Sequence, residues 1–162
     1  MGVEKIKTRE EIKELCVKLK AVGLTIVTTN GSYDILHAGH VRMLEEAKKQ
    51  GDILIVGLNS DKSVQAYKNK DRPIIPEQYR AELLAALECV DYVTLFDETV
   101  PMEFIKSVVP DIHVNYAGYG GDCVEKPLLD EIGAKLHLVG DLCDFSTTKI
   151  VDKIIKIYSK QN

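Results

Sequence analysis

The hydrophobic positions of the chain change repeatedly between two spacings. Apolar residues three or four apart, as in Ile12, Leu15, Cys16 and Leu19, predict amphipathic helices. Short aliphatic runs such as ILIVGL at 53–58 predict buried strands. We expect helices over 6–22, 39–49, 61–67, 77–87, 102–108, 128–132 and 146–158, and strands over 24–29, 53–58, 92–96, 112–115 and 135–139.

Local signals support the ends of the first helix and the buried face of a later one. Thr8 with Glu11 matches a capping box at the helix start, and Gly23 follows its end. The helix over 77–87 is expected to turn three leucines inward, namely Leu83, Leu84 and Leu87.

The alternation of strands and helices predicts an α/β fold. We expect one Rossmann-like domain over 1–162, with a five-stranded parallel sheet and helices on both faces. An N-terminal helical segment (1–23) precedes the core (24–158), and no repeat or linker divides the chain. Open parallel sheets bind ligands beyond the carboxyl ends of their strands. The loops after the first, second and fourth strands are therefore expected to carry the site.

Composition narrows the class of protein. The chain has 162 residues, of which 45% are hydrophobic and 28% charged, as in soluble domains. Its net charge of -4 argues against binding to duplex nucleic acid. It has neither a membrane-spanning apolar run nor a secretory signal, so we expect a cytoplasmic protein without nucleic-acid or membrane partners. Reduced, mostly buried thiols are expected for the widely spaced cysteines, Cys16, Cys89, Cys123 and Cys143.

The segment after the first predicted strand indicates a phosphate site. It reads Asn30-Gly31-Ser32-Tyr33-Asp34-Ile35-Leu36-His37-Ala38-Gly39-His40. Gly31 is expected to let the backbone turn closely, and the helix beginning near Gly39 adds the positive end of its dipole. His37 and His40 can donate hydrogen bonds to phosphate oxygens as charge develops. Without the His-Glu-x-x-His pattern or a third ligand nearby, we assign no protein-bound metal.

A basic segment follows the second predicted strand. Lys68, Lys70 and Arg72 precede Pro73, and Arg80 lies on the next predicted helix. Cations of this kind suit polyphosphate transfer, where negative charge spreads over the phosphoryl oxygens. A solvated charged loop is the alternative for this segment taken alone.

The start of the last predicted helix is a second candidate phosphate site. The segment reads Phe145-Ser146-Thr147-Thr148-Lys149-Ile150. Serine and threonine are preferred helix caps, and the free N–H groups there also bind phosphate. Together with the first loop, this segment can hold one triphosphate. The other histidines, His113 and His137, lie in apolar strands and are expected to be structural.

These segments together resemble the cytidylyltransferase-like nucleotidyltransferases. Within that superfamily the chain is similar to the D-glycero-β-D-manno-heptose 1-phosphate adenylyltransferases, which act in ADP-heptose synthesis for lipopolysaccharide. The resemblance runs from residue 25 to about 155. The motifs that carry it are Asn30 to His40 as quoted above, Leu58-Asn59-Ser60-Asp61, Arg72-Pro73 with Arg80, Ala86-Leu87-Glu88 with Val90-Asp91, and Ser146-Thr147-Thr148.

The resemblance implies an enzyme that transfers AMP from ATP to a sugar 1-phosphate and releases pyrophosphate. It implies catalytic roles for His37, His40 and Arg80, a homodimer, and Mg²⁺ that arrives with ATP. It implies nucleotide or substrate contacts for Asn30, Gly31, Ser32, Tyr33, Asp34, Gly39, Asn59, Asp61, Lys68, Arg72, Ser146, Thr147 and Thr148.

Two departures from the family pattern leave other substrates open. The heptose enzymes carry Val-Lys-Gly-Gly-Asp-Tyr after the fourth strand. This chain has Val114-Asn115-Tyr116-Ala117-Gly118-Tyr119-Gly120-Gly121-Asp122, so the lysine is missing and the loop is longer. The Ser-Thr-Thr-Lys-Ile segment is also typical of glycerol-3-phosphate cytidylyltransferase. The alternatives are therefore a CTP-dependent enzyme acting on a polyol phosphate and a non-catalytic nucleotide-binding protein.

Overall fold

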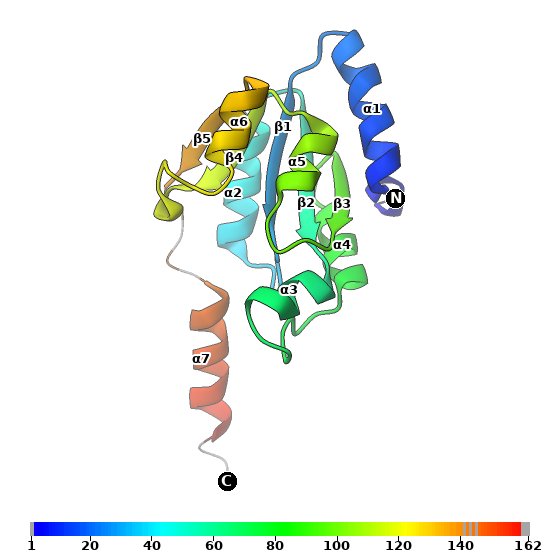
Figure 1. Cartoon of the computed structure of the whole chain (residues 1–162). Helices are drawn as coiled ribbons and strands as arrows, with labels where there is room; N and C mark the ends of the chain where they lie inside the picture. Colours follow the sequence, from blue (N-terminus) through cyan, green and yellow to red (C-terminus); the bar gives the residue numbers. More distant parts are fainter. Residues whose placement is uncertain (1, 141, 143, 145, 160–162) are drawn as a thin grey trace.

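The computed structural model describes residues 2–140, 142, 144 and 146–159. Within these ranges one short 3-10 helix (Val3–Lys5) and a second (Ala117–Tyr119) accompany the regular elements (Figure 1). In chain order these elements are α1 (Arg9–Ala21), β1 (Ile26–Gly31), α2 (Ala38–Lys48), β2 (Ile53–Asn59), α3 (Asp61–Tyr67), α4 (Glu77–Ala85), β3 (Tyr92–Phe96), α5 (Met102–Val108), β4 (Ile112–Tyr116), α6 (Lys126–Ile132), β5 (Lys135–Val139) and α7 (Thr147–Tyr158).

The five strands form one parallel sheet, as predicted, and their order is β3-β2-β1-β4-β5. The chain builds the sheet from β1 through β2 to β3 and then returns to the other side of β1 for β4 and β5. This reversal makes the carboxyl ends of β1 and β4 the switch point, where open α/β sheets bind ligands.

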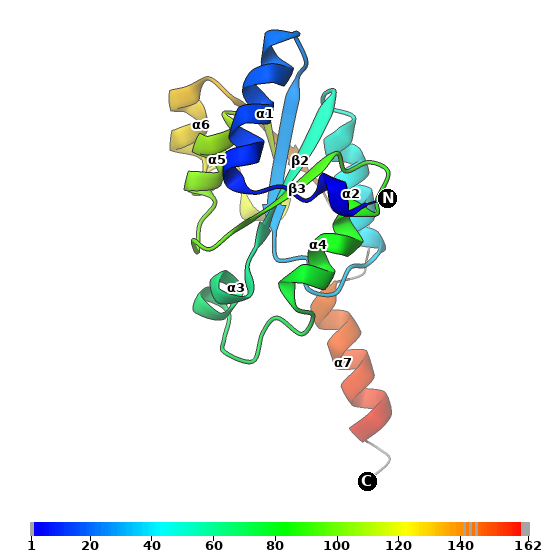
Figure 2. The same ribbon diagram turned by 90° about the vertical axis from the view of Figure 1, so that its right-hand side faces the viewer.

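Helices cover both faces of the sheet, which confirms the predicted layers (Figures 1 and 2). On one face α2 and α4 contribute buried residues such as Leu44 and Leu84 to a core with β1, β2 and β3. On the other face α1, α5 and α6 pack Ile12, Ile105 and Leu129 against the same sheet. The carboxyl ends of the strands stay uncovered by these two layers, so the site can form there.

Helix α1 starts and ends as its sequence indicates. The Thr8 side chain accepts from the backbone of Glu11, and the Glu11 side chain accepts from the backbone N–H of Thr8. Gly23 follows the helix with φ +81°, a left-handed conformation that favours glycine.

Two details of the predicted elements are wrong. Strand β1 runs over Ile26–Gly31 rather than 24–29, because its ladder with β2 continues through the pairs Asn30–Gly57 and Gly31–Leu58. In α4 the buried face is formed by Ala81, Leu84 and Ala85 together with Arg80. Leu84 is thus buried as predicted and Leu87 packs against the same core, but Leu83 points to solvent with 44% of its surface exposed.

The histidines and cysteines outside the first loop are mostly shielded. His113 is buried, and its Nδ1 lies 2.8 Å from Thr28 Oγ1, as expected of a structural histidine. His137 is only half-buried. Of the predicted thiols, Cys16 and Cys123 are buried and Cys89 is half-buried, while Cys143 lies outside the described residues.

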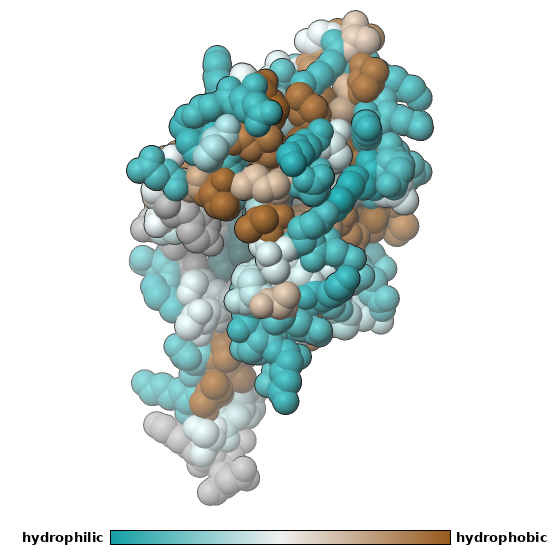
Figure 3. All heavy atoms as spheres, viewed as in Figure 1, coloured by the Kyte–Doolittle hydropathy of each residue, from teal (hydrophilic) through white to brown (hydrophobic). Residues whose placement is uncertain are grey.

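Helix α7 projects from the carboxyl end of the sheet (Figures 1 and 2). No residue of this helix is buried, and apolar side chains gather along it (Figure 3). The exposed ones are Ile154, Ile155, Ile157 and Tyr158. Across the described part of the chain, no helix has the length and apolar character needed to cross a membrane.

Candidate active site

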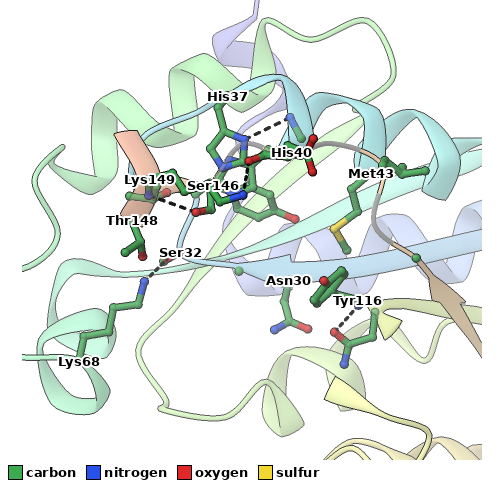
Figure 4. A pocket seen from close by; sticks show the side chains of 18 residues that line it. Asn30, Ser32, His37, His40, Met43, Lys68, Tyr116, Ser146, Thr148 and Lys149 are labelled. Carbon is green, nitrogen blue, oxygen red and sulfur yellow. Dashed lines mark hydrogen bonds between the residues drawn. The ribbon is translucent and has the colours of Figure 1, made fainter. Parts of the chain in front are cut away.

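A cavity of about 550 Å³, called the first cavity below, opens at the carboxyl ends of β1 and β4 (Figure 4). Its walls come from the segment between β1 and α2, the ends of β4 and β5, and the start of α7. The lining residues are Asn30, Gly31, Ser32, Tyr33, His37, Gly39, His40, Met43, Lys68, Asn115, Tyr116, Gly140, Leu142, Asp144, Ser146, Thr147, Thr148 and Lys149.

The two histidines of the first loop stack against each other in this cavity. Their ring centroids are 3.8 Å apart and their planes differ by 25°. His37 caps α2, and its Nδ1 accepts from the backbone N–H of Gly39 at 3.1 Å. Since Nδ1 is an acceptor, the proton of the neutral His37 ring is on Nε2, where it is available as a donor.

Both imidazoles are held neutral. Burial lowers the pKa of His37, and burial together with the nearby His37 and Lys68 lowers the pKa of His40 to about 4. The Nδ1 atom of His40 is buried and has no hydrogen-bond partner among the described residues. An anion beside these rings would supply the missing partner and the negative charge that favours protonation.

Tyr33 fixes the position of His40. It is a buried residue with φ +44°, a strained conformation for a side chain of this size. Its ring meets the His40 ring edge-on, with centroids 5.2 Å apart. Gly31 was expected to form a turn, but it ends β1. Its small size matters because a Cβ there would lie 3.1 Å from the Tyr33 ring.

The start of α7 lines the same cavity as these histidines (Figure 4). Ser146 caps the helix and accepts from the backbone N–H of Lys149 at 3.2 Å. The ammonium of Lys149 donates to the carbonyl oxygen of Asp144 at 2.7 Å. The predicted residues Ser146, Thr147 and Thr148 therefore share a cavity with the first loop, while Phe145 lies outside the described residues.

A second cavity of about 510 Å³ lies on the other side of the β1 end. The two cavities share Asn30, Gly31, Ser32, Lys68 and Asn115. The second cavity is otherwise lined by the ends of β2 and α3, the loop before α5 and the segment before α6. The residues are Asn59, Tyr67, Thr99, Val100, Pro101, Asp122, Cys123, Val124 and Glu125.

Lys68 is the one lysine or arginine common to both cavities among the described residues. Its ammonium donates to Ser32 Oγ at 3.1 Å, which holds it at the end of β1. Partial burial and the nearby charge of Arg72 lower the pKa of Lys68. A phosphate bridging the two cavities would meet this cation.

The buried Asp34 forms an ion pair with the half-buried Arg72, and neither residue lines a cavity. The two side chains lie 2.5 Å apart, and Asp34 also accepts from the backbone N–H groups of Ile74 and Ile75. The pair joins the β1–α2 segment to the loop after α3. Its geometry supports positioning of the loops rather than the predicted direct contact with nucleotide.

Arg80, predicted as a catalytic residue, is likewise buried and away from both cavities. Its guanidinium donates to the carbonyl oxygens of Ser32, Asn59 and Ile75 and pairs with Asp61 at 2.7 Å. These bonds link the ends of β1 and β2. Arg80 and Asp61 therefore hold the strand ends in place without lining a cavity. Asn59, another predicted contact, does line the second cavity.

Sequence reasoning missed several residues of the cavity walls. The loop after β3 supplies Thr99, Val100 and Pro101, although only the loops after the first, second and fourth strands were expected to contribute. The position of this loop at a strand carboxyl end was a usable signal. Met43 and Glu125 carried no local signal, because only the packing of distant segments turns them inward.

The described residues include no group of three or more histidine, cysteine, aspartate or glutamate side chains able to hold a metal ion. The carboxylates near the cavities are Asp144 in the first and Asp122 and Glu125 in the second. This donor set fits an ion that keeps most of its ligands from water and nucleotide phosphates.

The fold, with its histidine pair at the switch point, defines a nucleotidyltransferase. The sequence model of the cytidylyltransferase-like family matches residues 28–157, and the chain belongs to this family. The predicted resemblance is thereby confirmed.

Individual relatives agree with this assignment. The bifunctional protein HldE of a Nitratiruptor species is 48% identical over 152 residues, which are 93% of this chain and 32% of that protein. The chain thus spans about a third of the length of the curated relatives it matches. The crystal structure of a lipopolysaccharide core biosynthesis protein from Thermoplasma volcanium is 32% identical with a TM-score of 0.59, covering 76% of this chain and 100% of that one.

A more distant structure supports the fold alone. The pantoate-beta-alanine ligase of Francisella tularensis, crystallised with a β,γ-ATP ligand and β-alanine, is 15% identical with a TM-score of 0.64. The similarity covers 93% of this chain and 77% of the ligase chain.

Proposed function

We propose that the protein transfers AMP from ATP to a sugar 1-phosphate, giving an ADP-sugar and pyrophosphate, with D-glycero-β-D-manno-heptose 1-phosphate as the acceptor. The observation that carries this proposal is the pair of cavities that meet at the end of β1. A two-substrate transfer needs adjacent sites that bring the reacting atoms together. The resemblance of the motifs to the heptose 1-phosphate adenylyltransferases supports the heptose, and the name of the Thermoplasma volcanium relative supports a role in lipopolysaccharide core biosynthesis.

The first cavity suits the nucleotide. Its stacked imidazoles and the starts of α2 and α7 all offer donors to phosphate oxygens. The second cavity suits the acceptor, with the acceptor phosphate at the shared residues Ser32 and Lys68. The α-phosphorus of ATP would then lie at the junction of the two cavities.

The reaction follows from this arrangement. An oxygen of the acceptor phosphate attacks the α-phosphorus and forms a new P–O bond, while the bond from the α-phosphorus to the bridging oxygen of the β-phosphate breaks. Pyrophosphate leaves on the side opposite the attack. His37 donates from Nε2, and His40 and Lys68 stabilise the charge that grows on the phosphate oxygens.

Mg²⁺ is proposed to enter with the triphosphate. When bound it would neutralise part of the phosphate charge, and Asp144 is the carboxylate of the first cavity within the described residues. The protein residues orient the two phosphates, and the ion pairs Asp34–Arg72 and Asp61–Arg80, each with one buried partner, keep their loops in place.

The direct test is pyrophosphate release by the purified chain with Mg²⁺, offering ATP or CTP against heptose 1-phosphate and glycerol 3-phosphate. Turnover with ATP and the heptose is the expected outcome. Turnover only with CTP and glycerol 3-phosphate would assign the alternative pairing. Binding of ATP without pyrophosphate release from any pair would make the protein a nucleotide-binding protein.

We also propose that the chain forms a homodimer in the cytoplasm. The exposed apolar side of α7 supports self-association, because unburied apolar side chains gather along one projecting helix. Light scattering of the purified protein tests this. A dimeric mass that Ile154→Lys converts to a monomeric mass is expected, and a monomeric wild type would refute the proposal.

A further inference from the structure

Charge is distributed unevenly around the second cavity. Its lysine, Lys68, is shared with the first cavity and so lies where the two meet. Its carboxylates, Asp122 and Glu125, line the second cavity only and come from the segment before α6. An acceptor phosphate is therefore attracted to the junction, while the wall before α6 favours hydrogen-bond donors.

Of the two carboxylates that line this cavity, Glu125 is buried, with 5% of its surface exposed, while Asp122 is exposed. Among the described residues, Asn115 Nδ2 donates to the carboxylate of Glu125 at a long 3.4 Å from Oε2. The thiol of Cys123 lies beside it, and burial together with this carboxylate raises the pKa of Cys123.

A carboxylate accepts about four hydrogen bonds, and leaving that capacity unused in a buried place is costly. Within the described part of the chain, a long amide contact and a weak thiol donor leave at least two acceptor positions of Glu125 without a strong donor. The cavity next to it has room for the missing donors.

We propose that Glu125 binds hydroxyl groups of the acceptor and thereby selects a polyhydroxylated phosphate ester. Two neighbouring hydroxyls of a sugar ring match the two oxygens of one carboxylate, and bonds to an ionised acceptor are stronger than neutral ones. The acceptor is thus oriented from both ends, by Lys68 at its phosphate and Glu125 at its hydroxyls. This inference rests on the proposed function, since it assigns the second cavity to the acceptor.

The test compares the full-length wild type with Glu125→Gln, which keeps the shape of the side chain and removes its charge. The KM for heptose 1-phosphate is expected to rise about 10- to 100-fold, with kcat and the KM for ATP changed less than about threefold. Glu131→Gln is the matched control, because Glu131 is exposed on α6 and lines neither cavity.

Deoxy analogues separate direct contact from a structural effect. Two neighbouring members of the 2-deoxy, 3-deoxy and 4-deoxy heptose 1-phosphates should each bind the wild type more weakly than the parent sugar does. For these two analogues Glu125→Gln should cause a smaller further loss of affinity than it causes for the parent sugar, since one of the two contacts is already absent. If Glu125→Gln lowers the affinity for every analogue by the same factor, the assignment of Glu125 to the hydroxyls is overturned.

Calorimetric titration of heptose 1-phosphate keeps this inference distinct from the proposed reaction. If the wild type binds the sugar phosphate but releases no pyrophosphate, the reaction is wrong, and a weakened Glu125→Gln still supports the hydroxyl contact. If the wild type turns over and Glu125→Gln has unchanged KM and affinity, the role of Glu125 is wrong and the reaction stands. If the wild type binds no sugar phosphate, both fail.

Discussion

The two cavities share the end of one strand but differ in the chemistry of their walls. The first lies on the α2 side of the sheet, with stacked histidines and the starts of two helices. The second lies on the α5 and α6 side, with short loops and a buried carboxylate. The end of β1 thus borders two different sets of side chains. One set offers hydrogen-bond donors to phosphate, and the other offers acceptors to hydroxyl groups.

The largest expected loss of activity comes from replacing the histidines of the first cavity. Replacing His40 or His37 by alanine should lower kcat by about 10² to 10³, because each removes a donor placed where charge develops. ATP affinity, measured by calorimetry, should fall much less. His137→Ala is the control, since His137 lines neither cavity. Full turnover by His40→Ala would break the assignment of catalysis to this side.

Lys68 lies where the two cavities meet, so replacing it should weaken the binding of both substrates. Lys68→Met is expected to raise the KM for ATP and for the acceptor by about tenfold each, the scale of a lost charged hydrogen bond. Lys70→Met is the matched control, because Lys70 is exposed and lines neither cavity. An effect on one KM alone would assign Lys68 to a single cavity.

The start of α7 should act on the nucleotide only. Ser146→Ala removes the helix cap and a hydroxyl of the first cavity, and a KM for ATP raised about fivefold is expected from a loss of about 1 kcal/mol. The KM for the acceptor should not change. Thr8→Ala, which removes the cap of the distant helix α1, controls for general loss of helix stability.

The smallest signal is a change in titration. His40 in the free protein should titrate near its lowered pKa of about 4 when followed by NMR. ATP should raise this pKa, because anionic oxygens beside the ring favour the imidazolium, so more of His40 is protonated at a given pH. The sugar phosphate alone, bound in the second cavity, should shift it less. If ATP and the sugar phosphate shift the pKa of His40 equally, the assignment of the two ligands to different cavities is wrong.

Most of the fold was predictable because its signals are local. The helix over 61–67, the strand over 92–96 and the capping box of α1 were predicted where the structure has them. The buried face of α4 was predicted only in part, with Leu84 right and Leu83 wrong, because these two leucines are equally apolar. Only contact with the sheet selects one of them.

The sequence by itself determined the alternating pattern, the parallel sheet, and the glycine- and histidine-containing loop that approaches a helix start. Each of these depends on residues a few positions apart. Only the tertiary structure decided which charges face a ligand. Arg80 and Asp34 look like ligand contacts in the sequence, yet their bonds to Ser32, 48 positions away, and to Arg72, 38 positions away, occupy them inside the protein. Such a choice depends on the backbone groups and charges that folding brings together, which no local pattern specifies.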